Sequence, residues 1–377
     1  MELERALYLI VRYSAVGLPV IVLAGFAAGG WASYAGFLLV FVFYFMVEAV
    51  LHFSGIGTTT TQEDEFKFSS GPAGKAHEQA CLLFYSIMQL VAIATVLVLV
   101  SVRSYETYEL VGVVLSLGVM AGSVGGLASH EFIHRATRWE RWLGTALLGS
   151  INYAHFQVSH LRGHHRNVGL AHDWSTARFR ESSYAFLARA VGMGWLGACQ
   201  LEADRLRHKG VSAWSWRNFM VRWTAFQLAL WTGVAWFGGR TPLAVMAGYS
   251  VLAISFAEMV NYLSHYGLVR KVSARGVPEP FQDEHTWESN NKVTNWFIFN
   301  AGKHVHHHRN PGSTHDELTL AHDKAYLPHG LPLMTLIAYV PPLYFAVMDR
   351  MLEPGAGRPR REALAPAPVR SSRLSLA

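Results

Sequence analysis

Cysteine is scarce in this chain, which contains only Cys81 and Cys199. Two cysteines can build neither a disulfide framework nor the four-thiolate site of an iron–sulfur protein. The sequence also has no glycine-rich dinucleotide fingerprint after a strand-like segment, so neither flavin nor nicotinamide binding is predicted. Any electrons that the protein uses must therefore come from another molecule.

Charged residues are also few: they make up 15% of the 377 residues, whereas 51% are hydrophobic. Soluble domains usually contain about 25% charged residues, so the composition favours a membrane protein. Six long apolar runs with at most one charged residue each lie at about residues 13–30, 31–51, 81–102, 109–129, 223–239 and 242–262. Most approach the roughly 20 residues that cross a bilayer as a helix. The fifth run is the shortest and is interrupted by Gly233, Gly238 and Gly239.

Basic residues are distributed unevenly around these runs. If both termini lie in the cytoplasm, Arg103 and Arg240 are the only two of the 32 Lys and Arg residues in the loops on the far side. Because Lys and Arg concentrate in cytoplasmic loops, we predict a multi-pass protein of the cell inner membrane with its active site on the cytoplasmic side. The same bias accounts for the net charge of +6, so nucleic-acid binding is not predicted.

The chain is predicted to alternate membrane-spanning and cytoplasmic segments. The expected segments are 1–129 with transmembrane helices one to four, 130–222 with the first two histidine clusters, 223–262 with transmembrane helices five and six, 263–354 with the last two clusters and a membrane-associated segment, and 355–377 as a disordered tail. The apolar run 331–347 contains Pro341 and Pro342, which favours a packed or re-entrant segment over a seventh span. The predicted fold class is an all-α integral membrane protein with six transmembrane helices and a histidine-rich cytoplasmic cap.

Nine histidines stand in four short clusters. They are His130 and His134; His160, His164 and His165; His265; and His304, His307 and His308. Side chains at positions i and i+4 of a helix lie one above the other. Three pairs with this spacing are therefore expected to converge: His130 with His134, His160 with His164, and His304 with His308. The pattern predicts two metal ions whose protein ligands are imidazoles.

Imidazole nitrogen suits zinc, copper, iron and nickel, and carboxylates are scarce within the four clusters. Two irons fit best, because paired irons can share the oxidation of dioxygen while imidazole ligands leave positions open to it. The difficult chemistry would then belong to the metal pair, and the protein would orient an apolar substrate from the bilayer.

Two other classes of protein share part of this pattern. The segment from His130 to His134 reads HEFIH, a literal HExxH motif, so an intramembrane zinc metallopeptidase is an alternative. Such an enzyme needs one metal, whereas this chain offers seven further clustered histidines. A histidine-lined metal transporter or a haem-binding subunit is a third class, but transporters place their ligands near the bilayer midplane and these clusters lie at span ends.

Four segments of the sequence resemble one enzyme family. They are HEFIHR from His130, HLRGHHRNVG from His160, NYLSHYGLVRK from Asn261, and EHTWESNNKVTNWFIFN from Glu284, which leads into the final HxxHH. Their order and spacing are similar to those of the AlkB-type integral-membrane alkane hydroxylases and their xylene and cymene methyl monooxygenase relatives. The resemblance implies two non-haem irons bound by the nine histidines.

The resemblance also implies an activity and partners. The expected reaction is the O2-dependent hydroxylation of a terminal or benzylic methyl group of a hydrophobic substrate. Its electrons would come from a rubredoxin or ferredoxin-type donor with an NAD(P)H reductase. A lipid desaturase-like oxidation on the same scaffold is the alternative outcome.

Three acids that the family carries beside its histidines are replaced here by Ser159, Ser264 and His306. Carboxylates that hydrogen-bond ligand imidazoles orient them and raise their basicity. We therefore expect Ser159 and Ser264 to influence which substrate is accepted, and His306 to be a supporting or exposed residue rather than a tenth ligand. The other supporting candidates are Glu131, Asp173, Glu258 and Asn261.

Overall fold

A computed structural model describes residues 2–60, 72–321 and 326–352 of the chain. The predicted tail, residues 355–377, lies outside these residues. Within the described ranges the structure is helical, and β structure is limited to isolated bridges such as the one between Thr59 and Asn291. The predicted all-α fold class is confirmed.

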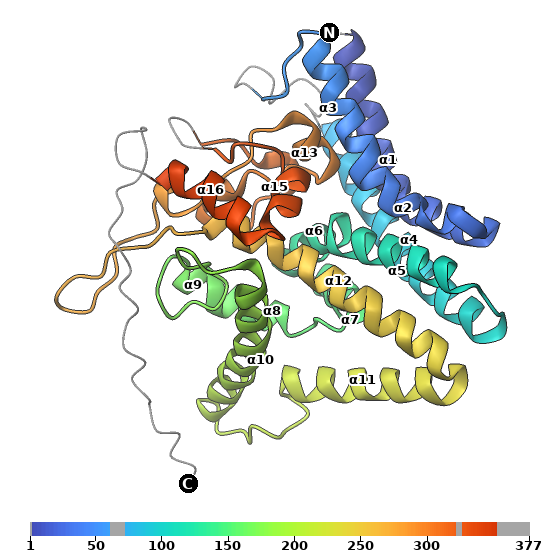
Figure 1. The fold of residues 1–377 in the computed structure, drawn as a ribbon. Coiled ribbons are helices and arrows are strands. Elements are labelled where there is room, and N and C mark those ends of the chain that lie inside the picture. Colours follow the sequence, from blue (N-terminus) through green and yellow to red (C-terminus); the bar gives the residue numbers. More distant parts are fainter. Residues whose placement is uncertain (1, 61–71, 322–325, 353–377) are drawn as a thin grey trace.

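Residues 2–150 form the elements from α1 to α7, apart from the undescribed residues 61–71 (Figure 1). Helix α1 (Glu2–Ala28) is the first apolar segment. The second apolar segment, Gly30–Phe53, consists of η1 (Gly30–Tyr34), α2 (Ala35–Leu38), η2 (Leu39–Phe43) and α3 (Tyr44–Phe53). Helices α4 (Pro72–Val102), α5 (Thr107–Gly122), α6 (Val124–His134) and α7 (Arg138–Ser150) come next.

The second half alternates long helices with short helical turns. The central elements are α8 (Phe156–Val158), η4 (Ser159–His164), α9 (His165–Asn167), α10 (Ser183–Arg207), α11 (Phe219–Gly233), η5 (Val234–Gly238) and α12 (Arg240–His265). The C-terminal elements are η6 (Asp283–His285), α13 (Lys292–Phe297), α14 (His304–Arg309), η7 (His315–Glu317), α15 (Leu331–Ala338) and α16 (Pro341–Leu352). The apolar run 331–347 therefore forms two short helices with a break before Pro341.

Five of the described helical segments are long and apolar enough to cross a membrane. They are Glu2–Ala28, Gly30–Phe53, Ala73–Val102, Thr107–His134 and Arg240–His265. The predicted span at 223–239 is helical, as α11 and η5, but it is not among the five. Arg222 and Gln227 make this segment less apolar than the others. By composition the structure supports five spans rather than the predicted six.

The path of the chain still gives α11 and η5 the place of a span. Helix α11 begins beside α10, where the backbone amide of Phe219 donates to Glu202 Oε2 at 2.9 Å. The segment ends at Gly239, where α12 begins, and α12 then returns to His265 beside the other histidine clusters. This segment therefore carries the chain from the histidine side to the opposite end of α12 (Figure 1).

Helix α5 packs closely along α12 through small residues. A Cβ added to Gly118 would overlap Leu252, and one added to Gly122 would overlap the carbonyl oxygen of Ala253. Such close backbone approach is how membrane helices commonly associate. At Ser123 the backbone leaves the helical conformation, with φ −85° and ψ −93°, so the span bends where α5 meets α6. The bend directs α6, which carries two of the predicted ligands, toward α12.

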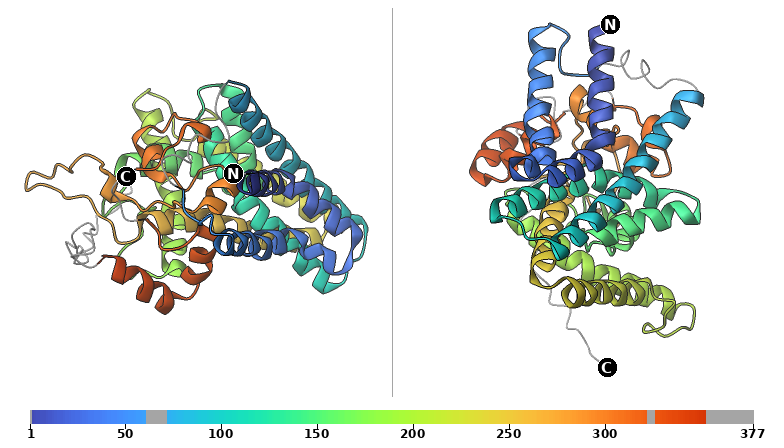
Figure 2. Two further views of the ribbon diagram at one scale, coloured as in Figure 1. Left: turned by 90° about the horizontal axis from the view of Figure 1, so that it is seen from above. Right: turned by 90° about the vertical axis from the view of Figure 1, so that its right-hand side faces the viewer.

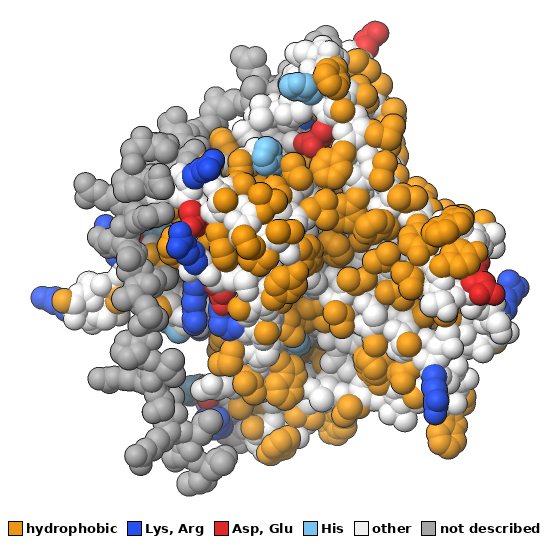
Figure 3. Space-filling view, in the orientation of Figure 1, with side chains coloured by type: hydrophobic (Ala, Val, Ile, Leu, Met, Phe, Trp, Pro, Cys, Tyr) orange, Lys and Arg blue, Asp and Glu red, His pale blue; other side chains and the backbone are white. Residues whose placement is uncertain are grey.

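The surface divides into apolar and basic regions. Hydrophobic side chains cover much of the face in Figure 3 that lies over the long helices, whereas Lys and Arg side chains gather on the side near the C-terminal helices. Figure 2 shows the start of α1 and helix α3 side by side, projecting together from the rest of the molecule. A broad exposed apolar surface is expected where lipid replaces water. The chain is a membrane protein.

Candidate metal centre

The nine predicted ligands lie together where α6, η4, α12 and α14 meet. They form two groups, and within each group one ligand atom per residue lies within 4.8 Å of all the others. The first group consists of His130, His134, His160, His165 and His307, and the second of His164, His265, His304 and His308. Each group can hold one metal ion.

Two short segments supply ligands to both groups. The segment formed by η4 and α9 contributes His160 and His165 to the first group and His164 to the second, and α14 contributes His307 to the first group and His304 with His308 to the second. Helix α6 serves only the first group, and α12 serves only the second. The two metal positions therefore depend on the same two parts of the chain, the η4–α9 segment and α14.

The expected i, i+4 convergence holds in α6 and α14 but is wrong in η4. There, His160 and His164 belong to different groups. The reason is that residues Ser159–His164 form a π-helical turn. A π-helix pairs position i with i+5, so His165 takes the place beside His160, and their Nε2 atoms are 3.0 Å apart.

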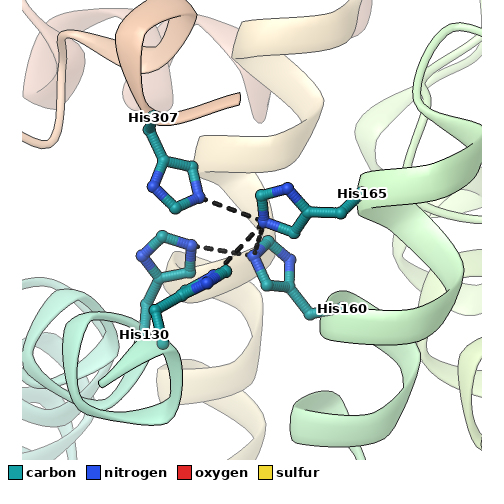
Figure 4. A group of neighbouring side chains, drawn as sticks. His130, His160, His165 and His307 are labelled. Atoms are coloured by element: carbon teal, nitrogen blue, oxygen red, sulfur yellow. Dashed lines mark hydrogen bonds between the residues drawn. The ribbon is translucent and has the colours of Figure 1, made fainter. Parts of the chain in front are cut away.

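In the first group the Nε2 atoms point toward one another (Figure 4). The Nε2 atom of His165 lies 3.1 Å from that of His307 and 3.2 Å from that of His134. The Nε2 atom of His130 lies 2.8 Å from that of His160. Two nitrogens on one ion, each about 2.0–2.1 Å from the metal, are separated by about 3 Å. The distances therefore fit imidazoles that share one ion.

The second group has the same arrangement. The Nε2 atom of His304 lies 3.3 Å from that of His265 and 3.1 Å from that of His308. His164 Nε2 is buried and has no hydrogen-bond partner. Buried polar atoms are nearly always paired, and a metal ion at this point would satisfy the nitrogen. The donor set of this group therefore fits a metal ion as well.

Six of the ligands lie outside the membrane-spanning segments, and His160, His165, His307 and His308 are four of these. Burial lowers the pKa of each of these four imidazoles well below its usual value, and the neighbouring histidines lower it further. Imidazole must be neutral to bind a metal. These side chains are therefore in their ligating form at neutral pH.

Asp173 supports one ligand directly, as the sequence leads us to expect. Its Oδ2 accepts the Nδ1–H of His164 at 2.8 Å, and neither side chain is exposed to solvent. The hydroxyl of Thr176 also donates to Oδ2, at 2.7 Å, and the backbone amide of Ser175 donates to Oδ1 at 3.2 Å. This arrangement fixes the imidazole so that Nε2 faces the second group.

Glu131 turns away from the ligands beside it in the sequence. Its Oε1 accepts from Arg135 Nη2 at 2.7 Å and from the backbone amide of His315 at 3.1 Å. These hydrogen bonds join α6 to η7. Glu131 therefore supports the centre by holding α6 in place rather than by bonding a ligand imidazole.

Glu258 and Asn261 lie one helical turn apart on α12. The hydroxyl of Tyr153 donates to Glu258 Oε1 at 2.7 Å, and Asn261 Nδ2 donates to Oε2 at 3.2 Å. His306 faces away from both groups, with Nδ1 accepting from the backbone amide of Thr319 at 3.1 Å. These residues thus brace the helices that carry the ligands.

The sequence analysis missed Glu288, which is fully buried. Its Oε1 accepts from the backbone amide of Val305 at 2.9 Å and its Oε2 from that of Ala321 at 3.0 Å. The first of these bonds anchors the start of α14. No spacing in the sequence singles out this residue, because a hydrogen bond to a backbone amide leaves no pattern in the sequence.

A largely apolar cavity reaches the metal centre. Its lining includes His130, His304 and His307 of the two groups, together with Glu131 and His315. The wall also includes Val40 and Phe41 of η2, Gly122 of α5, Gly126 of α6, Phe256 of α12 and Thr335 of α15. The cavity therefore joins the metal positions to helices that span the membrane.

Ser159 and Ser264 are not on the wall of this cavity. Both are buried, at 4% exposure. The Oγ of Ser159 donates to the carbonyl oxygen of Phe156 at 3.3 Å, and the carbonyl oxygen of Ser264 accepts from the amide of Trp287 at 2.7 Å. Any influence of these serines on substrate choice must act through their neighbours.

With this geometry established, comparison with known proteins identifies the family. The model of the fatty acid desaturase family matches residues 107–337. The chain belongs to the fatty acid desaturase family. This family match includes all nine histidines of the two groups.

Within this family, the chain is similar to several monooxygenases. It is 37% identical over 238 residues to alkane 1-monooxygenase 1 of Pseudomonas aeruginosa, an alignment covering 63% of this chain and 62% of that protein. It is 32% identical to alkane 1-monooxygenase of Pseudomonas putida, over 66% of this chain and 62% of the relative. It is 27% identical to the xylene/toluene monooxygenase hydroxylase component XylM of Pseudomonas putida, over 65% of each chain. The resemblance inferred from the sequence is confirmed, although the chain spans less than two thirds of the length of these relatives.

Proposed function

We propose that this protein is a membrane-bound, non-haem di-iron monooxygenase. Its substrate would carry a terminal or benzylic methyl group, and the reaction would convert R–CH3, O2, two electrons and two protons into R–CH2OH and water. The observation that supports this most directly is the pair of imidazole groups beside an apolar cavity. The alkane and xylene/toluene monooxygenases among its relatives support the same class of reaction.

The residues of the chain have distinct parts in this proposal. His130, His134, His160, His165 and His307 would hold one iron, and His164, His265, His304 and His308 would hold the other. The iron pair, when bound, supplies the activation of dioxygen. The apolar wall excludes water and holds the substrate methyl group beside the first group. The buried Asp173 keeps His164 in the required orientation.

Electrons would come from a rubredoxin or ferredoxin-type protein with its NAD(P)H reductase. The chain itself offers two separate cysteines and no nucleotide-binding fingerprint, which supports an external donor. Apart from Arg103 and Arg240, the Lys and Arg residues lie in segments predicted on the same side of the membrane as the histidine clusters. This distribution supports an inner-membrane protein with its active site facing the cytoplasm.

A lipid desaturase-like oxidation is the second candidate, because the family model is that of fatty acid desaturases. It differs only in the last step, where a second hydrogen is removed before the hydroxyl group is transferred. A zinc metallopeptidase is less well supported, since the two histidines of the HEFIH motif share their group with three further imidazoles. A transporter is less well supported because the ligands lie at the ends of α6 and α12.

Metal analysis combined with substitution tests the proposal. We expect about two irons per chain in the purified protein, and loss of iron and of product formation in His164→Ala and in His307→Ala. His208→Ala is the matched control, because His208 is exposed and lies outside both groups. One zinc per chain, or unchanged turnover in His164→Ala without iron, would contradict the di-iron assignment.

A further inference from the structure

His315 is a buried histidine outside both metal groups, with 1% of its surface exposed. Its imidazole lies between two carboxylates from different helices. Nδ1 is 3.5 Å from Glu131 Oε1 on α6, and Nε2 is 3.8 Å from Glu78 Oε2 on α4. Its backbone amide also donates to Glu131 at 3.1 Å, which holds the imidazole in this position.

The carboxylates beside His315 belong to helices that are long and apolar enough to cross a membrane. Glu78 is buried, accepts the hydroxyl of Tyr8 at 2.8 Å, and lies 3.5 Å from Arg12 Nε on α1. Ionisable side chains inside membrane helices are costly, and they commonly mark paths for ions or protons. A network of this kind calls for a function beyond packing.

One side of His315 faces the cavity. His315 and Glu131 line the same cavity as His130 and His307, which are ligands of the first group. His315 therefore lies on the wall of the cavity in which the proposed reaction would take place.

The residues that follow His315 in the chain lead to the surface. The next residue, Asp316, accepts a hydrogen bond from Gln79 Nε2 at 2.9 Å through Oδ1. Glu317 follows and pairs with Lys75 at 3.1 Å, with both side chains about half exposed. A carboxylate that is about half exposed to solvent thus stands two residues after the buried imidazole.

The surrounding charges favour the protonated form of His315. Burial alone lowers its pKa, but the contacts with Glu131 and Glu78 outweigh this effect and raise the pKa above the usual value of imidazole. Arg12 on α1 acts in the opposite direction. Tyr8 is the other titratable side chain on α1 that faces the network. His315 can therefore carry a proton near neutral pH.

We propose that His315 is the residue that delivers protons to the cavity in the monooxygenase reaction proposed above. The inference depends on that function. Each turnover breaks the O–O bond of dioxygen and one C–H bond: one oxygen atom enters the product, and the other leaves as water after taking up two electrons from the donor and two protons. His315 releases a proton toward the cavity, becomes neutral, and takes up the next proton from the side of Asp316 and Glu317.

The test compares His315→Gln with His155→Gln in the full iron-loaded protein, supplied with an electron donor and an alkylbenzene. Glutamine keeps hydrogen-bonding capacity but cannot carry a proton. His155 is a suitable control because it is also buried, belongs to neither metal group and is not on the cavity wall. We expect His315→Gln to retain two irons, to form product at least about 100-fold more slowly, and to release more hydrogen peroxide per dioxygen consumed. His155→Gln should remain within about twofold of the wild type.

A second measurement follows the proton itself through thermal stability. A group with a raised folded-state pKa stabilises the protein below its unfolded pKa, and this stabilisation is lost as pH rises through the folded pKa. The melting-temperature difference between wild type and His315→Gln should therefore be largest below the usual imidazole pKa of about 6.5 and shrink as the pH rises above it. Burial lowers the pKa of His155 to about 4, so the difference between wild type and His155→Gln should not shrink over this range.

Three results would overturn the inference. Wild-type product formation and peroxide release in His315→Gln would exclude a role in proton delivery. Loss of iron in proportion to activity would show that His315 is only structural. A wild-type protein that carries two irons and receives electrons, yet oxidises no hydrophobic substrate, would overturn the proposed monooxygenase function and this inference with it.

Discussion

His164 and Asp173 form a hydrogen-bonded pair that is completely shielded from solvent, with 2.8 Å between Nδ1 and Oδ2. A carboxylate in this position fixes the tautomer of a ligand imidazole and makes it a stronger donor to a metal. The second group, to which His164 belongs, therefore depends on a residue that touches no metal position itself.

Replacing this carboxylate should weaken the second metal position. We expect Asp173→Asn to lower metal affinity by about 10–100-fold, measured by competition with a chelator of known affinity. Asp204→Asn is the control, because Asp204 pairs with Arg207 at the surface. Equal chelator sensitivity in the two variants would show that Asp173 does not tune the centre.

Gly163 offers a test of the π-helical turn. A Cβ at this position would overlap the indole of Trp174, which packs against η4. We expect Gly163→Ala to destabilise the protein by about 1–3 kcal/mol and to lower the occupancy of both metal positions, measured as metal content and melting temperature. Gly192→Ala on α10 should change neither, since a Cβ there meets nothing within 4 Å. Adding Trp174→Leu to Gly163→Ala should restore part of the metal content, and no recovery would argue against this steric explanation.

The supply of electrons can be tested with the purified protein. We expect no product with NADH alone, because no reductase or nucleotide motif is present in the chain. Addition of a rubredoxin or ferredoxin with its reductase should start product formation, measured by gas chromatography. Oxygen-dependent turnover with NADH as the sole addition would contradict the expected external donor.

The two serines that replace family acids can be tested together. From the sequence, Ser159→Glu with Ser264→Glu is expected to shift preference toward alkanes by about tenfold, or about 1.4 kcal/mol. Neither serine lines the cavity. The structure therefore favours a different result, in which the double variant changes iron content and changes the rates with octane and with an alkylbenzene by the same factor. The ratio of the two products in wild type and double variant decides between these outcomes.

The helical fold and the identity of the clustered histidines could be predicted from the sequence because both depend on local pattern. Apolar runs of about 20 residues indicate membrane helices, and the spacing in α6 and α14 places histidines on one face. The prediction failed where local pattern is ambiguous. No residue pattern in the sequence distinguishes a π-helical turn from an α-helical one. The pairing of His160 with His165 instead of His164 could therefore not be predicted.

Other parts of the site depend on long-range contacts, which a single sequence does not reveal. His315 becomes notable only because α4 and α6 bring Glu78 and Glu131 to its two ring nitrogens. Glu288 becomes notable only because its carboxylate meets two backbone amides. Glu288 lies in one of the four segments that resemble the enzyme family, but no spacing assigns a role to Glu288 or to His315.

The way in which each group draws its ligands from separate stretches of chain has a consequence for folding. An ion in the first group would tie α6 to η4 and α14, and an ion in the second would tie η4 to α12 and α14. Each ion thereby closes long loops of chain, as a cross-link does. The two cysteines of the chain form no disulfide, so the metal ions would be the cross-links between segments that are distant in the sequence. Folding of the ligand-bearing helices and metal binding would then be thermodynamically coupled.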